Sequence, residues 1–417
     1  MRKRLAFSRM APIVVLVGVL LSTSPFGLPR EATAQPNDSP YRLVGYYPSY
    51  GIYEDYFVTD IPATELTHLN YAYIGISDNG QCVSIDPWTD TRYSYPGDEA
   101  NLRLRGNIRQ LQLLRGNHPD LKILMTIGGW NDSGNFSDVA LTPAARTRFA
   151  QSCVAFMREY LFDGIDIDWR YPVSGGQTDG RPADLENFTL LLAELRAQLD
   201  TAGERDGRTY YLSMLAPAFP QLYQNIELNN AHIYLDWINL MTFGFHGEWS
   251  ELASHHAPLY ANTRDPRGEE MQQLYNVDAV VNVFLDAGVP ANKLVVGLPF
   301  YAQTWLNVRP NDYFGLYQRA DGVPAGTRPG GILYYRDMIP LLTNVNYTRF
   351  FDDEVRASWL YSAEERIAIS YDDAQSLRDK VMYVRQHRLG GVMIWQVSYD
   401  DKDNPLLEVV NDALYQQ

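Results

Sequence analysis

Eight short apolar segments alternate with helical patterns along the chain, and this alternation restricts the possible folds more than any other feature of the sequence. The segments predict β-strands at residues 42–47, 67–73, 122–127, 164–169, 211–216, 235–241, 293–298 and 391–396. Helical periodicity occurs between them, at residues 101–114, 143–160, 183–199, 277–287 and 373–387. Eight β–α alternations favour an α/β fold of the (β/α)8 TIM barrel type. The pattern also permits an open, doubly wound sheet, because periodicity does not show whether a sheet closes.

Residues 306–369 interrupt the alternation between the seventh strand and the last predicted helix. They are rich in Tyr, Gly, Pro and β-branched residues and have little helical period, which predicts a small α+β insertion. The barrel would then comprise residues 41–305 and 370–417. An aromatic insertion at a barrel rim forms either a cleft wall or a stabilising hairpin, and the composition leaves both open.

The N-terminus has the pattern of a secretory signal peptide over residues 1–34. Basic residues precede an apolar run at 11–21, and small residues follow up to Ala34, after which we expect cleavage. The apolar run is too short to span a bilayer, and no cysteine lies near the cleavage site. We therefore expect a secreted protein without a membrane anchor, in which residues 35–40 form a short disordered lead.

The charge of the chain argues against two classes of partner. The formal net charge is −15, and it becomes −19 when the expected signal peptide, with five basic residues and one acidic residue, is removed. Such a charge disfavours nucleic acids and anionic membranes. The seven histidines show no metal-binding spacing. We expect no metal and no cofactor, and we expect a monomer.

Cys82 and Cys153 are the only cysteines in the chain. Export permits a disulfide between them. Cys153 lies among Phe149, Phe156 and Met157 in a helical pattern, so a buried free thiol is equally compatible with the sequence.

The segment from Asp163 to Pro172 reads Asp-Gly-Ile-Asp-Ile-Asp-Trp-Arg-Tyr-Pro and contains the strongest candidate for a functional strand. On a β-strand, Asp166, Asp168 and Arg170 share one face, and the two isoleucines point the other way. Carboxylates on such an apolar strand are costly to bury unless they have partners or a use. This pattern of acidic residues on an apolar strand is typical of a parallel barrel strand whose carboxyl end lies in an active site.

This segment resembles the signature strand of glycoside hydrolase family 18, the chitinases, which reads Asp-Gly-x-Asp-x-Asp-Trp-Glu and is usually followed by Tyr-Pro. Every fixed position matches except the last, where Arg170 replaces the family's proton-donating Glu. Further similar motifs occur at residues 45–51, 126–130, 241–247, 297–301 and 390–396. Motifs on six strands, in order, make the resemblance specific. The insertion is similar to that of bacterial chitinases with a deep cleft.

The resemblance implies substrate-assisted hydrolysis, in which the Glu protonates the glycosidic oxygen, an Asp orients the substrate's acetamido group and a Tyr holds its carbonyl. The implied catalytic positions here are Asp166, Asp168 and Arg170, with Phe243 in place of the Tyr and Gly244 in place of a further Asp. A guanidinium group releases no proton at neutral pH. Loss of a general acid typically lowers the rate by about 10²–10⁴-fold, so we expect hydrolysis to be lost or strongly impaired.

Arg170 has two interpretations at this stage. It pairs with Asp168 or Asp166, because residues two apart on a strand lie about 7 Å apart and buried acids need partners. Alternatively, it forms hydrogen bonds to sugar hydroxyls. We favour the pairing.

Aromatic residues at or just beyond the strand ends predict a sugar-binding surface, since sugar rings stack on aromatic faces that line a cleft. The candidate substrate-binding residues are Tyr46, Tyr47, Trp130, Tyr171, Met241, Phe243, Tyr301, Trp305 and Trp395. For any one aromatic ring, packing in the core is the alternative. The resemblance implies that Trp395 forms the floor of the central sugar subsite.

Three functions are compatible with these features. The first is a secreted, chitinase-like protein that binds chitin or N-acetylglucosamine oligosaccharides as a lectin. The second is an active chitinase that uses another acid, such as Asp168, Asp166 or Glu248. The third is a protein-binding or inhibitory role on the same fold, which ranks last because the sequence shows no exposed apolar patch.

Overall fold

The computed structural model describes residues 39–99 and 101–416. The expected signal peptide (1–34) lies outside the described residues, as does most of the expected lead (35–40). Within the described ranges, eight parallel strands close into a barrel: β1 (Arg42–Pro48), β2 (His68–Ile76), β4 (Lys122–Gly128), β5 (Gly164–Asp168), β6 (Tyr211–Ala216), β7 (Trp237–Leu240), β8 (Leu294–Pro299) and β14 (Gly391–Trp395). They pair in this order, and β14 returns to β1. The TIM barrel prediction is confirmed, and the open sheet is excluded.

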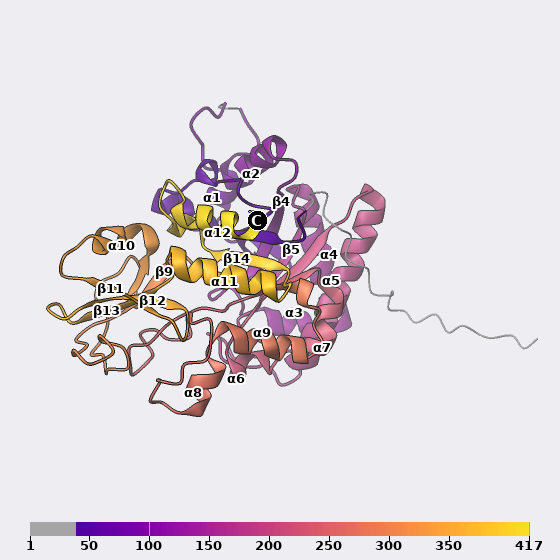
Figure 1. Ribbon diagram of the computed structural model, residues 1–417. Helices are drawn as coiled ribbons and strands as arrows, with labels where there is room; N and C mark the ends of the chain where they lie inside the picture. Colours follow the sequence, from indigo (N-terminus) through magenta and orange to yellow (C-terminus); the bar gives the residue numbers. More distant parts are fainter. Residues whose placement is uncertain (1–38, 100, 417) are drawn as a thin grey trace, which may run out of the picture. The chain divides into compact units, whose positions relative to one another are not determined.

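Helices lie between the barrel strands (Figure 1). They are α1 (Pro87–Thr91), α2 (Gly106–Asn117), α3 (Phe136–Leu141), α4 (Pro143–Glu159), α5 (Asp184–Asp206), α6 (Pro220–Tyr223), α7 (Leu228–Ala231), α8 (Glu269–Leu274), α9 (Val277–Asp286), α11 (Ala374–Gln386) and α12 (Pro405–Tyr415). Short 3-10 helices are η1 (Ser49–Glu54), η2 (Val58–Asp60), η3 (His232–Tyr234), η4 (Ala291–Lys293) and η5 (Val397–Tyr399).

The helix ends show which local signals act as expected. Helix α4 begins at Pro143, and the Thr142 hydroxyl accepts a hydrogen bond from the backbone N–H of Ala145 at 3.2 Å. Helix α5 runs beyond the predicted end at residue 199, and Gly207 ends it with a φ of +65°. Helix α12 is an additional helix whose apolar residues, Leu406, Leu407, Val410 and Leu414, are buried at helical spacing.

The insertion is an antiparallel sheet with one short helix. Its strands lie in the order β10 (Ile332–Tyr334), β9 (Tyr301–Trp305), β13 (Ile367–Tyr371), β12 (Ala357–Ser362) and β11 (Thr348–Asp352), and α10 (Tyr335–Leu342) follows β10. Figure 1 shows this group in orange. An α+β insertion is confirmed. Its sheet starts at Tyr301 and ends at Tyr371, so its first and last strands in sequence, β9 and β13, include residues that periodicity alone assigns to the barrel.

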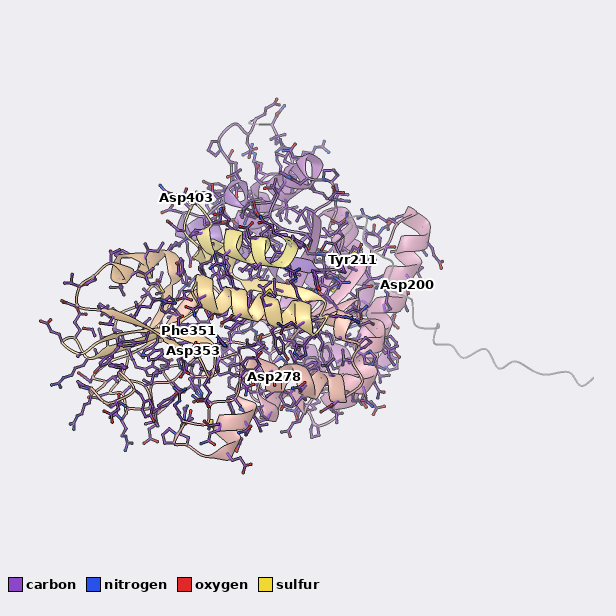
Figure 2. All side chains as sticks on the ribbon, in the orientation of Figure 1. Asp200, Tyr211, Asp278, Phe351, Asp353 and Asp403 are labelled. Carbon is purple, nitrogen blue, oxygen red and sulfur yellow. A yellow bond between two sulfur atoms is a disulfide. The ribbon has the colours of Figure 1, made fainter. Side chains whose placement is uncertain are left out.

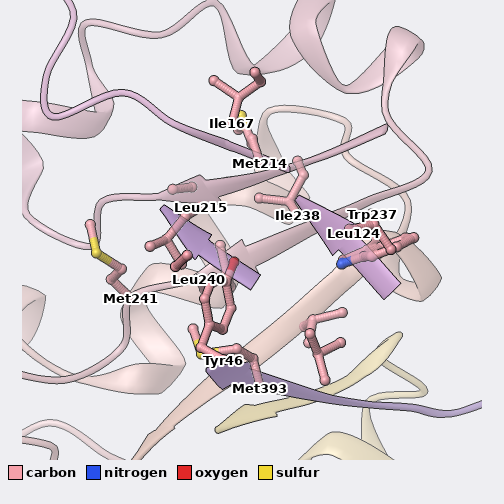
Figure 3. Packing of buried hydrophobic residues seen from close by; sticks show 14 of the residues in the cluster. Tyr46, Leu124, Ile167, Met214, Leu215, Trp237, Ile238, Leu240, Met241 and Met393 are labelled. Atoms are coloured by element: carbon pink, nitrogen blue, oxygen red, sulfur yellow. The ribbon is translucent and has the colours of Figure 1, made fainter. Parts of the chain in front are cut away.

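The barrel strands are buried on both faces, as expected for parallel strands covered by helices. Their apolar side chains form a large core with the helices, part of which is shown in Figure 3, where Tyr46, Leu240 and Met393 are labelled. The two faces of the insertion sheet have smaller cores of their own. The helices are also linked by polar contacts: the Tyr383 hydroxyl in α11 donates to Asp278 in α9 at 2.8 Å (Asp278 is labelled in Figure 2).

Cys82 and Cys153 form a disulfide, with Cα atoms 5.0 Å apart. It joins the short strand β3 (Cys82–Ser84), which pairs antiparallel to β2, to helix α4. The free-thiol alternative is therefore wrong. Among the described residues, no helix combines the length and the apolar character needed to cross a membrane.

Candidate functional site

The predicted site residues meet at the carboxyl ends of the barrel strands. Asp168 ends β5, Trp395 ends β14, and Gly128 ends the neighbouring strand β4. In a closed parallel barrel all these ends lie on one rim, which is where TIM barrel enzymes carry their active sites.

Asp166 lies below this rim and is fully buried. Its Oδ2 accepts hydrogen bonds from the hydroxyls of Tyr46 (2.7 Å) and Thr126 (3.1 Å). Its Oδ1 accepts from the Ser213 hydroxyl (2.6 Å) and from Nδ2 of Asn239 (3.3 Å). Burial raises the pKa of Asp166 to about 6, although the hydrogen bonds oppose this shift. Asp166 is thus a fully satisfied structural carboxylate.

Asp168 is also fully buried, and Arg170 neutralises it. Nε of Arg170 donates to Oδ1 of Asp168 at 2.8 Å, and Nη2 donates to Oδ2 at 2.9 Å. This two-bond geometry is the strongest form of an arginine–carboxylate pair. Burial opposes the charge of Arg170, but Asp168 together with Tyr73 and Tyr171 outweighs this effect and raises the pKa of Arg170 well above its ordinary value. The pairing interpretation of Arg170 is confirmed, and its partner is Asp168.

The backbone around this pair is closely packed. Gly128 has a φ of +105°, and a Cβ on it would lie 2.4 Å from the carbonyl oxygen of Asp168, so only glycine fits there. The Ser133 hydroxyl accepts from the backbone N–H of Arg170 at 2.9 Å and donates to the carbonyl of Asp168 at 3.1 Å. The end of β5 is therefore held by β4 and the loop that follows it.

The residues after β7 make one side of the site apolar. Phe243 is buried, and its ring centroid lies 6.2 Å from that of Trp395 and 6.0 Å from that of Tyr301. Gly244 has a φ of +67°. Met241 is buried just before them. These positions offer neither the hydroxyl nor the carboxylate that the resemblance implies.

The candidate aromatic residues differ in their exposure. Trp130 is 47% exposed, and its ring lies edge-on to that of Tyr171, with centroids 6.5 Å apart. Trp395 is half-buried, whereas Tyr171 and Tyr301 are almost covered. Of these four, Trp130 offers the most open ring to a ligand.

Three of the candidates do not present a ring to a ligand. Tyr47 is fully buried, and its hydroxyl donates to the carbonyl of Tyr56 at 3.1 Å. Tyr46 is fully buried and supports Asp166. Trp305 is buried in the core of the insertion, where its indole N–H donates to the carbonyl of Gly247. Placing Tyr47 and Trp305 on the binding surface was wrong, because alternation along a strand does not show which face is covered. For Tyr46, packing in the core is the correct alternative.

The structure adds residues that the sequence did not single out. Ser213 and Asn239 bind Asp166, and Ser213 lies directly opposite it in the register of β5 and β6. Tyr73 lies near Asp168: burial, with a contribution from that carboxylate, raises the pKa of its phenol. Trp249, in the loop after β7, is 61% exposed. Only Trp249 had a signal in the sequence, as a large aromatic residue close to a site motif.

In the part of the chain that the structure describes, no group of three or more His, Cys, Asp or Glu side chains is placed to hold a metal ion. The polar groups of the site are instead bonded to one another.

Comparisons with known proteins agree with this geometry. Residues 42–400 match the family described as glycosyl hydrolases family 18. Chitinase A1 of Niallia circulans is 39% identical over 96% of this chain, which spans 62% of that protein's length. Endochitinase 1 of Metarhizium robertsii is 34% identical over 94% of this chain and 89% of its own length.

Solved structures of a chitinase and of a further family 18 enzyme are also similar to this chain. A chitinase from Bacillus thuringiensis has a TM-score of 0.84 and 33% identity, over 90% of this chain and 70% of that one. A glycoside hydrolase family 18 N-acetylglucosaminidase from Paenibacillus barengoltzii has a TM-score of 0.73 and 34% identity, over 90% of this chain and all of that one (100%).

Proposed function

Because the chain belongs to glycosyl hydrolase family 18, we propose that it is a secreted protein that binds chitin or N-acetylglucosamine oligosaccharides, with hydrolysis lost or strongly impaired. The observation that carries this proposal is the pair formed by Arg170 and Asp168. Arg170 stands where the resemblance implies a proton-donating Glu, and its guanidinium stays charged at any working pH. Its partner Asp168 is already neutralised, so its charge is not free to stabilise a cationic sugar ring.

The other carboxylates considered as replacement acids are poorly placed. Asp166 is fully buried and accepts four hydrogen bonds. Glu248 is exposed, and its carboxylate lies beside Gly330 of the insertion, about 3 Å from where a Cβ would be. A general acid must reach the atom that it protonates. The four hydrogen bonds hold Asp166 in the barrel interior, and Glu248 lies against the insertion.

Binding is supported by the exposed rings of Trp130 and Trp249. Trp130 follows β4 and Trp249 lies in the loop after β7, and an exposed aromatic face is a surface on which a sugar ring can stack. Secretion is supported by the N-terminal signal pattern.

The test uses purified protein from residue 35 onward in a pull-down with insoluble chitin and a hydrolysis assay, beside Arg170→Glu and the triple variant Arg170→Glu/Phe243→Tyr/Gly244→Asp. We expect the unaltered protein to bind without hydrolysis, and hydrolysis to rise in the variants. Gly244→Asp is feasible because Asp tolerates positive φ better than most residues. Absence of binding would refute the proposal.

The names of the relatives, chitinase A1 and endochitinase 1, favour an alternative: an active chitinase with a non-standard acid. Aryl leaving groups need little protonation, so an aryl chitobioside is the most permissive substrate for this test. Release of the aryl group by the unaltered protein, abolished by Asp168→Ala, would establish the alternative.

A further inference from the structure

Arg170 extends into the centre of the site and is held there by two kinds of contact. Its guanidinium makes both hydrogen bonds to Asp168, and its central carbon lies 5.3 Å from the ring centroid of Trp395. That distance is within the range of a cation–π contact. The side chain is only 14% exposed. Arg170 is therefore packed against the ring that the resemblance implies as the floor for a sugar.

Three side chains of the protein crowd the half-buried ring of Trp395. The Tyr46 ring lies 5.2 Å away and the Phe243 ring 6.2 Å away, measured between centroids, and Arg170 lies over it as well. A sugar that stacked on Trp395 would have to displace Arg170. Asp168 would then be a buried carboxylate without its cation, which is strongly unfavourable.

We infer that Arg170 closes the central sugar position by covering Trp395, so that chito-oligosaccharides bind over the outer aromatic residues Trp130 and Trp249. This inference rests on the proposed function and specifies its ligand-binding surface. Arg170 then has a role beyond the loss of an acid: it competes with a sugar ring for the face of Trp395.

The exposed tryptophans Trp130 and Trp249 lie on the same side of the rim. Trp130 follows β4 and Trp249 follows β7, with β5 and β6 between them. On the other half, Nε2 of Gln396 after β14 donates to the Tyr50 hydroxyl after β1 at 3.2 Å. Arg328 of the insertion lies over the Tyr50 ring, 4.9 Å from its centroid. At β1 and β14, the ring and the hydroxyl of Tyr50 are thus engaged by contacts within the protein.

Isothermal titration with chitotriose and chitohexaose tests this inference on the protein from residue 35 onward. The variants are Arg170→Ala, Trp395→Ala, their combination and Trp130→Ala. We expect Arg170→Ala to bind chitohexaose at least tenfold more tightly than the unaltered protein. The loss of affinity caused by Trp395→Ala should be at least tenfold larger in the Arg170→Ala background than in the unaltered protein. Trp130→Ala should weaken binding by the unaltered protein at least tenfold.

The outcomes separate this inference from the proposed function. If the unaltered protein binds neither sugar but Arg170→Ala binds through Trp395, the proposed function fails and the closure stands. If Arg170→Ala gains no affinity, or Trp395→Ala weakens both backgrounds equally, the closure is refuted. Thermal melting checks that each variant is folded. Arg170→Gln, which retains a hydrogen bond to Asp168, replaces Arg170→Ala in the same comparison if that variant does not fold.

Discussion

Replacing Arg170 by alanine tests whether its pair with Asp168 stabilises the barrel. Asp168 is fully buried and Arg170 is 14% exposed, so the variant leaves a carboxylate without its cation in a protein interior. Breaking a buried pair in this way typically costs about 3–5 kcal/mol of unfolding free energy. Loss of the contact with Trp395 adds about 0.5–1 kcal/mol.

Unfolding by urea, followed by tryptophan fluorescence and circular dichroism at pH 7, measures this loss. The cycle also includes Asp168→Asn and the double variant. The double variant should be more stable than Arg170→Ala, because asparagine leaves no buried charge, and the cycle should be non-additive by about 2 kcal/mol or more. The matched control is Arg319→Ala, which removes an exposed pair with Glu251 and should cost less than about 1 kcal/mol.

Two results would refute this reasoning. One is an unfolding free energy of Arg170→Ala within about 1 kcal/mol of the unaltered protein, the size of an exposed pair. The other is additivity of the two single variants. Either would mean that water or another group compensates Asp168 when Arg170 is absent.

Three further predictions concern parts of the fold away from Arg170. The folded-state pKa of Asp166, about 6, lies above its ordinary value of 3.8, so its ionisation destabilises the fold. The contribution of Asp166 to the unfolding free energy should therefore rise by about 2.4 kcal/mol from pH 7 to pH 4. Asp166→Asn should lack this gain in urea unfolding at several pH values, and parallel pH curves would contradict the assignment. Replacing Cys82 and Cys153 by serine opens a loop with a sequence separation of 71 residues and should cost about 4 kcal/mol; unchanged stability relative to the oxidised protein would show that the disulfide does not constrain the chain. Gly128→Ala should cost about 3 kcal/mol or more in thermal or urea unfolding, because φ is +105° and the Cβ meets a backbone carbonyl. The control Gly116→Ala, in helix α2 with nothing within 4 Å, should be neutral or stabilising.

The fold could be predicted from sequence because its signals are local. The β–α alternation predicted all eight barrel strands within a few residues, and the helical pattern at residues 143–160 predicted the start of α4. Boundaries failed where tertiary pairing decides them. Tyr301 joins the insertion sheet through its pairing with β10, and no local pattern distinguishes that strand from the end of β8.

The site was predicted only in part. The predicted strand at residues 164–169 agrees with β5, which ends at Asp168. Trp130 is exposed, and its role in binding stays a prediction. Tyr47 and Trp305 were misplaced, because a ring at a strand end can turn inward as readily as outward. Exposure depends on which segments cover a face, and that is a property of the assembled fold.

By itself, the sequence determined the barrel class, the interrupted alternation and the presence of an arginine at position 170, since these depend on residue identity and period. The tertiary structure decided which acid Arg170 neutralises. Strands β1, β4, β6 and β7 bring four donors to Asp166, which leaves Asp168 as the carboxylate in need of a cation. The tertiary structure also decided that the guanidinium of Arg170 lies over the ring of Trp395. Residue identity specifies which partners are possible, but only strand register and barrel closure bring a particular pair within bonding distance.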